Sequence, residues 1–210
     1  RVYSMKVLLI NGSPHEKGCT YTALSLIAGE LKAQGIETEI LHVGGQPVGG
    51  CIGCGGCRSG NGCVFGGVVN EAIEKAKTAD AFVFGSPVHY ASAAGNMASF
   101  MDRLAYAGGK YLAYKPAAVC CSARRAGTTS TLDQLVKYPQ FFHMPLVNGS
   151  YWAMVHGSNP EQVLQDAEGC AVMQELGRNM AWLLRCIEAG KAAGIDHPQN
   201  PPRPMTNFIR

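Results

Sequence analysis

Charge and long hydrophobic runs are the two features that this chain has little of. Only 16% of its 210 residues are charged, and the net charge is +3. So small a positive excess gives no reason to expect binding to nucleic acid. No run of about eighteen apolar residues occurs, so we expect no membrane-spanning helix. The first apolar run is only about six residues long and leads into a turn, so we expect no signal peptide.

Hydrophobic residues make up 47% of the chain, which is enough for a large core, and 210 residues fit one domain. The nine cysteines are odd in number, and four of them fall within the thirteen positions from Cys51 to Cys63. A disulfide framework is normally even in count and more evenly spread. We therefore predict a reducing, cytoplasmic setting in which cysteines are core residues or ligands.

Residues 5–22 predict a strand, a polar loop and the start of a helix. The apolar run at 6–10 is typical of a buried strand, and the Asn-Gly-Ser-Pro sequence at 11–14 ends it. An amphipathic run follows at 23–31. Backbone N–H groups at the helix start, with the hydroxyls of Ser13, Thr20 and Thr22, suit a phosphate group. The alternative is a plain capped helix that binds only water.

The rest of the chain alternates between strands and helices. Further strands are predicted at 36–43, 80–85, 117–122 and 145–148. Helices are predicted at 68–78, 96–107 and 130–137, with a long one within 161–189; residues 151–159 give an ambiguous pattern. Residues 44–67 form a Gly- and Cys-rich loop that is too long for a simple connection, and residues 198–210 are a Pro-rich tail.

This alternation predicts an α/β fold built from right-handed βαβ units. Residues 1–210 are expected to form a single flavodoxin-like domain, a three-layer sandwich whose five-stranded parallel sheet has the order 2-1-3-4-5, with loop 44–67 inserted after the second strand. Ligands of such sheets bind where the strand order reverses. Loops 13–22 and 87–95 should therefore face each other across one crevice, with 122–128 beside it.

Three motifs together carry a family resemblance: residues 5–22, the cysteine loop, and Gly-Ser-Pro-Val-His-Tyr at 85–90. Their combination resembles the NAD(P)H-dependent FMN reductase and iron–sulfur flavoprotein family over roughly 5–187. The resemblance implies an oxidoreductase that passes a hydride from NAD(P)H to FMN and on to an acceptor, such as a flavin, a quinone or a redox protein. Hydride transfer itself needs no acid–base side chain, so no catalytic residue is predicted.

The resemblance also implies which residues bind FMN. In the first loop, which would grip the phosphate, they are Ser13, His15, Gly18, Cys19, Thr20, Tyr21 and Thr22. In the loops on either side of the flavin ring they are Pro87, Val88, His89, Tyr90, Ser122, Arg124 and Gly127. His15 stands where the family usually has Arg, and Cys19 where it usually has Asn. An exposed loop histidine, an ordinary βα loop at 87–92 and a surface arginine are the alternatives at these positions.

Four cysteines, Cys51, Cys54, Cys57 and Cys63, are spaced like the thiolate run around a [4Fe–4S] cluster. Zinc sites more often pair two well-separated CxxC units. The alternative is a flexible thiol loop, either redox-sensitive or near a subunit interface. With a cluster, the chain would be an electron carrier that exchanges single electrons with protein partners; a flavin-free metal or thiol sensor is a third hypothesis.

Met97, Phe100, Met101 and Leu104 recur at helical spacing, which predicts a core-facing stripe. The resemblance adds a second interpretation, a subunit contact, because these flavoproteins are generally oligomers. We therefore expect a homo-oligomer, a dimer or a tetramer.

Overall fold

The computed structural model describes residues 4–207. Its sheet is formed by β1 (Lys6–Asn11), β2 (Glu37–His42), β3 (Ala81–His89), β4 (Ser92–Ala93), β5 (Ala117–Ala123) and β6 (Met154–His156). Strands β2-β1-β3-β5-β6 are parallel neighbours in that order, and β4 pairs antiparallel with the end of β3. Counted over the parallel strands alone, this is the predicted order 2-1-3-4-5, so the predicted fold is confirmed.

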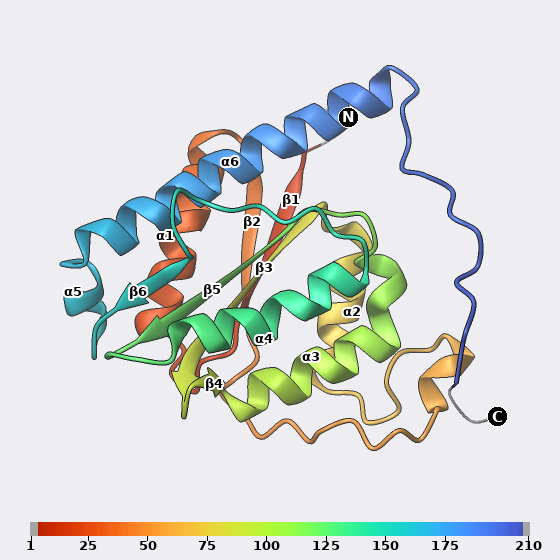
Figure 1. Cartoon of the computed structure of the whole chain (residues 1–210), viewed down its shortest axis with the longest axis horizontal. Helices are drawn as coiled ribbons and strands as arrows, with labels where there is room; N and C mark the ends of the chain where they lie inside the picture. The colour runs from red at the N-terminus through yellow and green to blue at the C-terminus, as the bar shows by residue number, and fades with distance from the viewer. Residues whose placement is uncertain (1–3, 208–210) are drawn as a thin grey trace.

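Helices cover both faces of the sheet (Figure 1). On one face lie α1 (Cys19–Ala33), the short α5 (Pro160–Val163) and α6 (Ala167–Ala192). On the other face lie α2 (Val68–Thr78), α3 (Gly95–Gly108) and α4 (Thr128–Phe141), with the 3-10 turns η1 (Gly56–Ser59) and η2 (Gly109–Tyr111). None of the helices within residues 4–207 is long and apolar enough to cross a membrane.

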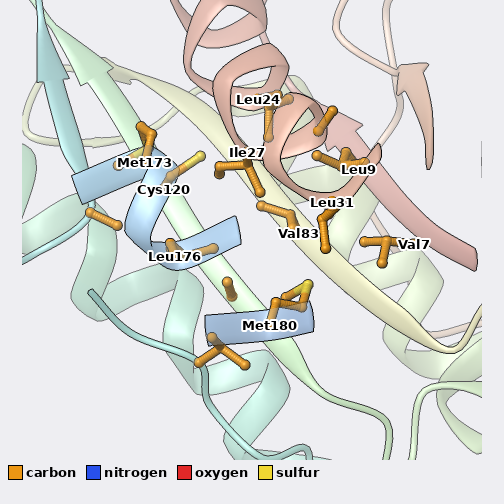
Figure 2. Close-up of a cluster of buried hydrophobic side chains, with 14 of the residues drawn as sticks. Val7, Leu9, Leu24, Ile27, Leu31, Val83, Cys120, Met173, Leu176 and Met180 are labelled. Atoms are coloured by element: carbon orange, nitrogen blue, oxygen red, sulfur yellow. The ribbon is translucent and has the colours of Figure 1, made fainter. Parts of the chain in front are cut away.

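The alternation of side chains along β1 divides the core into two clusters. Val7 and Leu9 point towards α1 and α6, where they lie with Ile27 and Leu176 in the cluster of Figure 2. Leu8 and Ile10 point to the opposite face and pack against α2 and α3. A strand buried on both faces needs apolar residues at every position, which explains the continuous apolar run in the sequence.

The predicted stripe on α3 is confirmed as core. Met97, Phe100, Met101 and Leu104 are all buried, with exposed fractions of 1% or less. Since they are already covered within one chain, they offer no surface to a second subunit.

The predicted position of the last strand was wrong. Residues 145–148 make only an isolated bridge, in which Ala117 N donates to Pro145 O and Val147 N donates to Ala117 O. The chain then leaves the sheet and returns as β6, which pairs with the other end of β5. Side chains of α6 hold this excursion: Asn179 Nδ2 donates to Asn148 O, and a Glu175 carboxylate oxygen accepts the N–H of Ser150.

The predicted long helix within 161–189 is confirmed as α6, which runs on to Ala192. The short α5 precedes it as a separate helix, and Asp166 starts α6 by accepting the N–H of Gly169 at 2.9 Å. The Pro-rich tail is extended as far as it is described, and residues 208–210 lie outside the described residues. The ring of His197 stacks on Tyr114 at 4.3 Å, and Asn200 Nδ2 donates to the Tyr114 hydroxyl at 2.7 Å.

Candidate functional site

Three loops meet at the carboxyl edge of the sheet, as the strand order predicts. They follow β1, β3 and β5. Gly12 N donates to Gly85 O at 2.9 Å, which joins the first loop to β3. The hydroxyls of Thr20 and Ser122 are 2.8 Å apart, which joins the start of α1 to the end of β5. The structure therefore brings residues from all three predicted loops to one edge.

The first loop is shaped by a residue that the sequence analysis did not select. Asn11 is fully buried at the end of β1; its Oδ1 accepts the N–H of Ser13 at 3.1 Å, and its Nδ2 donates to Glu16 O at 2.9 Å. His42 Nε2 lies 2.7 Å from Ser13 O and fastens the loop to the end of β2. The signal for Asn11 was present in the sequence, because asparagine before glycine commonly bonds to the backbone two residues on.

The three predicted phosphate donors differ in whether their hydroxyl groups already donate hydrogen bonds within the protein. The buried Ser13 accepts the N–H of His15 through Oγ at 3.1 Å, and within residues 4–207 its own hydroxyl proton has no acceptor. By contrast, Thr22 Oγ1 donates to Gly18 O at 3.2 Å, and Thr20 is buried against Ser122. Ser13 is therefore the hydroxyl best able to donate to an added anion.

The N-cap residue of α1 is Gly18, which has no side chain to cap the helix, so the N–H groups of the first turn are available at the positive end of the helix dipole. His15, Gly18 and Cys19 border a hollow of about 500 Å³ together with residues 158–160. The Cys19 thiol donates to Gly157 O at 3.5 Å, and burial raises its pKa. His15 is exposed and Tyr21 is half-buried. The structure thus places these residues around one helix start.

The second loop is a tight hairpin with two residues in the left-handed region. Tyr90 has φ 51° and Ala91 has φ 58°, between the paired residues His89 and Ser92. Two central residues with positive φ define a turn that is normally built from Asn and Gly. Non-glycine residues there cost on the order of 1 kcal/mol or more each and cluster at functional sites. Tyr90 is fully exposed at the tip.

Polar side chains hold this strained hairpin in place. Ser86 Oγ accepts the N–H of Ala94 at 3.0 Å from within β3. From α4, Gln134 Oε1 accepts the N–H of Ala93 at 2.9 Å, and Ser130 Oγ donates to Ala91 O at 2.7 Å. Pro87 and Val88, just before the turn, are half-buried, and His89 is exposed.

The third loop packs directly against the hairpin. Gly127 has φ +95°, and a Cβ added there would lie 2.8 Å from Ala91 Cα and 2.9 Å from Val88 Cγ1. Only glycine satisfies both the backbone conformation and the close approach. Arg124 and Arg125 are exposed, and neither is in a salt bridge within the described part of the chain. Arg124 thus lies in the loop after β5 with no salt-bridge partner among residues 4–207, and its predicted contact with the flavin stays a prediction.

The four cysteines of loop 44–67 line one cavity of about 310 Å³ at the side of α3. In residues 4–207, however, no three His, Cys, Asp or Glu side chains are close enough together to hold a metal ion. A buried cation also lines the cavity: Arg103 Nε donates to Cys63 Sγ at 3.3 Å. Asn70 grips the backbone of Cys63 on both sides, accepting from its N–H at 2.8 Å and donating to its carbonyl at 3.0 Å.

The sheet order and the three interlocked loops define a flavodoxin-like α/β fold. Residues 5–159 match the family model described as NADPH-dependent FMN reductase. The chain therefore belongs to the NADPH-dependent FMN reductase family.

Curated relatives are similar over most of the chain or about half of it. An iron–sulfur flavoprotein of Methanocaldococcus jannaschii is 28% identical over 192 residues, which cover 88% of this chain and 100% of that protein. An iron–sulfur flavoprotein of Archaeoglobus fulgidus is 36% identical over 99 residues, which cover 47% of this chain and 48% of that protein.

Solved structures share the fold at low sequence identity. RosB with a bound intermediate has a TM-score of 0.68 at 15% identity, with 99% of this chain and 94% of that chain covered. The apo form of an NADH:FMN oxidoreductase, EmoB, has a TM-score of 0.62 at 18% identity, with 88% and 90% covered.

Proposed function

We propose that this chain binds FMN at the carboxyl edge of its sheet and passes a hydride from NAD(P)H to FMN and on to an acceptor such as a free flavin or a quinone. The observation that carries the proposal is the interlock of the loops after β1, β3 and β5, in a chain of the FMN reductase family. Bound FMN would supply the two-electron chemistry, which leaves the protein to bind, orient and shield it.

The residues fit the two ends of such a cofactor. Ser13 and the uncapped start of α1 offer donors to a phosphate. We assign the flavin ring to the edge formed by the hairpin at 87–91 and the loop at 122–127, where Arg124 is exposed and has no salt bridge within residues 4–207. A cation near the ring stabilises the anionic reduced flavin, so Arg124 is the residue we assign to that task.

The phosphate assignment is tested by Ser13→Ala, with Ser25→Ala as the matched control on the half-buried surface of α1. A hydrogen bond to a charged group contributes about 1.5–3 kcal/mol, so we expect Ser13→Ala to raise the Kd for FMN about 10- to 100-fold. Titration of flavin-free protein with FMN measures it. Equal Kd values for the two variants would reject this phosphate site.

The reaction is tested by steady-state oxidation of NADH and of NADPH, with a quinone or free flavin as acceptor. Turnover with either nucleotide that depends on bound FMN supports the reductase. Negligible turnover with both nucleotides, in protein that carries FMN, would reject it.

We propose as a second function that Cys51, Cys54, Cys57 and Cys63 hold a [4Fe–4S] cluster through which the chain exchanges single electrons with a redox protein. The relatives named iron–sulfur flavoproteins favour it, as does the shared cavity. Thiolates are the ligands that such clusters take. Loading requires the sulfurs to converge, and loop 44–67 is suited to this because 11 of its 24 residues are glycine.

Iron and acid-labile sulfide, measured on protein purified without oxygen, test the cluster. We expect about four irons per chain, as the cluster type requires. Cys54→Ser should abolish iron and leave FMN bound, whereas Cys186→Ser, at an exposed position on α6, should keep both. Wild-type protein without iron after anaerobic reconstitution would reject the cluster and leave the reductase proposal intact.

We also propose that the chain forms a dimer or tetramer. The exposed aromatic side chains of Tyr90, Trp152 and Tyr106 support this proposal. Light scattering during size-exclusion chromatography gives the mass, and a monomer at micromolar concentration would contradict it.

A further inference from the structure

Within the described part of the chain, Arg103 is a buried cation without a carboxylate partner. Its exposed fraction is 7%, and no salt bridge within residues 4–207 includes it. Its guanidinium donates to Cys63 Sγ at 3.3 Å, to Gly66 O at 3.0 Å and to Gly49 O at 3.4 Å. The guanidinium carbon also lies 5.7 Å from the centre of the Phe65 ring.

A buried charge is costly unless an opposite charge lies close to it. Two of the three acceptors of Arg103 are neutral carbonyls, and the ring of Phe65 carries no net charge. The adjacent Asp102 is engaged elsewhere, because its Oδ1 accepts the hydroxyl of Tyr138 at 2.6 Å. Among the contacts that Arg103 makes within residues 4–207, only the sulfur of Cys63 can become an anion, and a neutral thiol is a weak acceptor. The surroundings of Arg103 therefore suit a negatively charged sulfur.

We propose that Arg103 is the positioning residue of the cysteine site: a fixed positive charge that holds the anionic sulfur of Cys63 and favours the reduced form of the group bound there. This inference rests on the proposed cluster. Reduction of a bound cluster would take one electron from a redox protein, with no bond made or broken. The positive charge of Arg103 would stabilise the added negative charge, and the step includes no proton transfer.

Helix α3 connects this cation to the flavin side of the molecule. Asn96, in its first turn, donates through Nδ2 to Gly44 O at 3.1 Å and to Gln46 O at 3.0 Å. Arg103 follows seven residues later, which is about two turns and about 10 Å along the helix. The same face of α3 thus fastens loop 44–67 at both ends, along the course that the loop takes beside α3 in Figure 1.

The test uses the full-length chain, purified without oxygen, with Arg103→Gln, Arg103→Lys and Arg58→Gln. Arg58 lines the same cavity but is exposed, so solvent screens its charge and it serves as the matched control. Dye-mediated redox titration, followed by electron paramagnetic resonance, gives the midpoint potential. Iron and FMN contents are measured on the same samples.

We expect Arg103→Gln to lower the ratio of reduced to oxidised cluster at a fixed potential about ten-fold. For one electron this corresponds to a midpoint potential that is lower by about 59 mV. Arg103→Lys keeps the charge and should shift the ratio by less than half as much, and Arg58→Gln by less than two-fold. Should Arg103→Gln lose its iron, retention of iron by Arg103→Lys supports the proposal, and loss from both overturns it.

Equal shifts in Arg103→Gln and Arg58→Gln would also overturn the proposal, since they would show a general effect of charge. If Arg103→Gln retains its iron and has the midpoint potential of the wild type, the proposed role of Arg103 is refuted, whereas the proposed cluster is not. Iron-free wild-type protein refutes the cluster, and this role with it, while leaving FMN binding untouched.

Discussion

Substitution of Gly44 by alanine is expected to displace the phosphate loop without touching a predicted ligand. Gly44 follows β2 and lies directly under the first loop. A Cβ added there would lie 2.2 Å from Ser13 O and 2.5 Å from Gly12 O. Both atoms belong to the backbone, so no side-chain rotation can relieve the overlap.

The size of the displacement follows from the same distances. Ordinary contact with a Cβ begins at 3.4 Å, so the Ser13 carbonyl must recede by 3.4 − 2.2 = 1.2 Å. That carbonyl is also the partner of His42 Nε2 at 2.7 Å, so the movement disturbs the bond that fastens the loop. Overpacking of this kind costs about 1–3 kcal/mol of folding free energy. Because the Ser13 hydroxyl also loses its alignment, we expect the Kd for FMN to rise about 10- to 100-fold.

The assay pairs FMN titration of flavin-free protein, followed by quenching of flavin fluorescence, with urea unfolding of the same sample. Gly49→Ala is the matched control: it lies in the same segment, its φ is not positive, and nothing lies within 4 Å of the added Cβ. We expect Gly49→Ala to bind FMN like the wild type. If Gly44→Ala also binds FMN within two-fold of the wild type and unfolds at the same urea concentration, the loop is not held where the structure places it.

Two further predictions concern stability. Hydrogen bonds from Lys6 and Lys75 hold the pKa of Glu39 below its ordinary value of 4.5, so their stabilisation is complete above that pH and is lost as pH falls through the lowered pKa. Glu39→Gln should therefore cost about 1 kcal/mol at pH 7 in urea unfolding, and a difference that persists in acid would contradict this reading. Gly177→Ala should cost about 1–3 kcal/mol, because the added Cβ would lie 2.8 Å from a backbone carbonyl of α1. Gly29→Ala, with nothing within 4 Å, should instead stabilise by up to about 1 kcal/mol; equal effects of the two glycine substitutions would refute the close packing of α1 and α6.

The sequence was sufficient for the sheet because its strands are buried on both faces. Continuous apolar runs marked β1, β3 and β5, and polar loops followed each of them. It failed for the last strand, since the apolar residues at 145–148 satisfy the same pattern as β6. What separates the two segments is a pair of long-range bonds from Asn179 and Glu175 on α6, and no local pattern encodes those bonds.

The sequence predicted which loops form the candidate site, but not the hydrogen bonds that hold those loops in place. Sequence reasoning placed the three loops at one edge because parallel strands end together. It gave Thr20 and Thr22 the same role as Ser13, whereas the structure commits both threonine hydroxyls to bonds within the protein. It also did not select Gln134, more than forty residues from the hairpin that it holds. Such partners depend on tertiary contacts, which are invisible to motif spacing.

The tip of the hairpin between β3 and β4 shows how such hydrogen bonds relate to the proposed function. Tyr90 and Ala91 hold left-handed conformations that an Asn-Gly turn would adopt with little strain. The structure maintains them with Gln134 and Ser130, both from α4. A fold under no other demand would be more stable with Asn-Gly at these positions. Asn-Gly would remove the fully exposed tyrosine ring at the tip of the hairpin, so we infer that this ring is the reason for the strain. Tyr90→Asn combined with Ala91→Gly should therefore stabilise the fold in urea unfolding while weakening FMN binding. A variant that gained stability and kept its affinity would show that the strain has no part in the site.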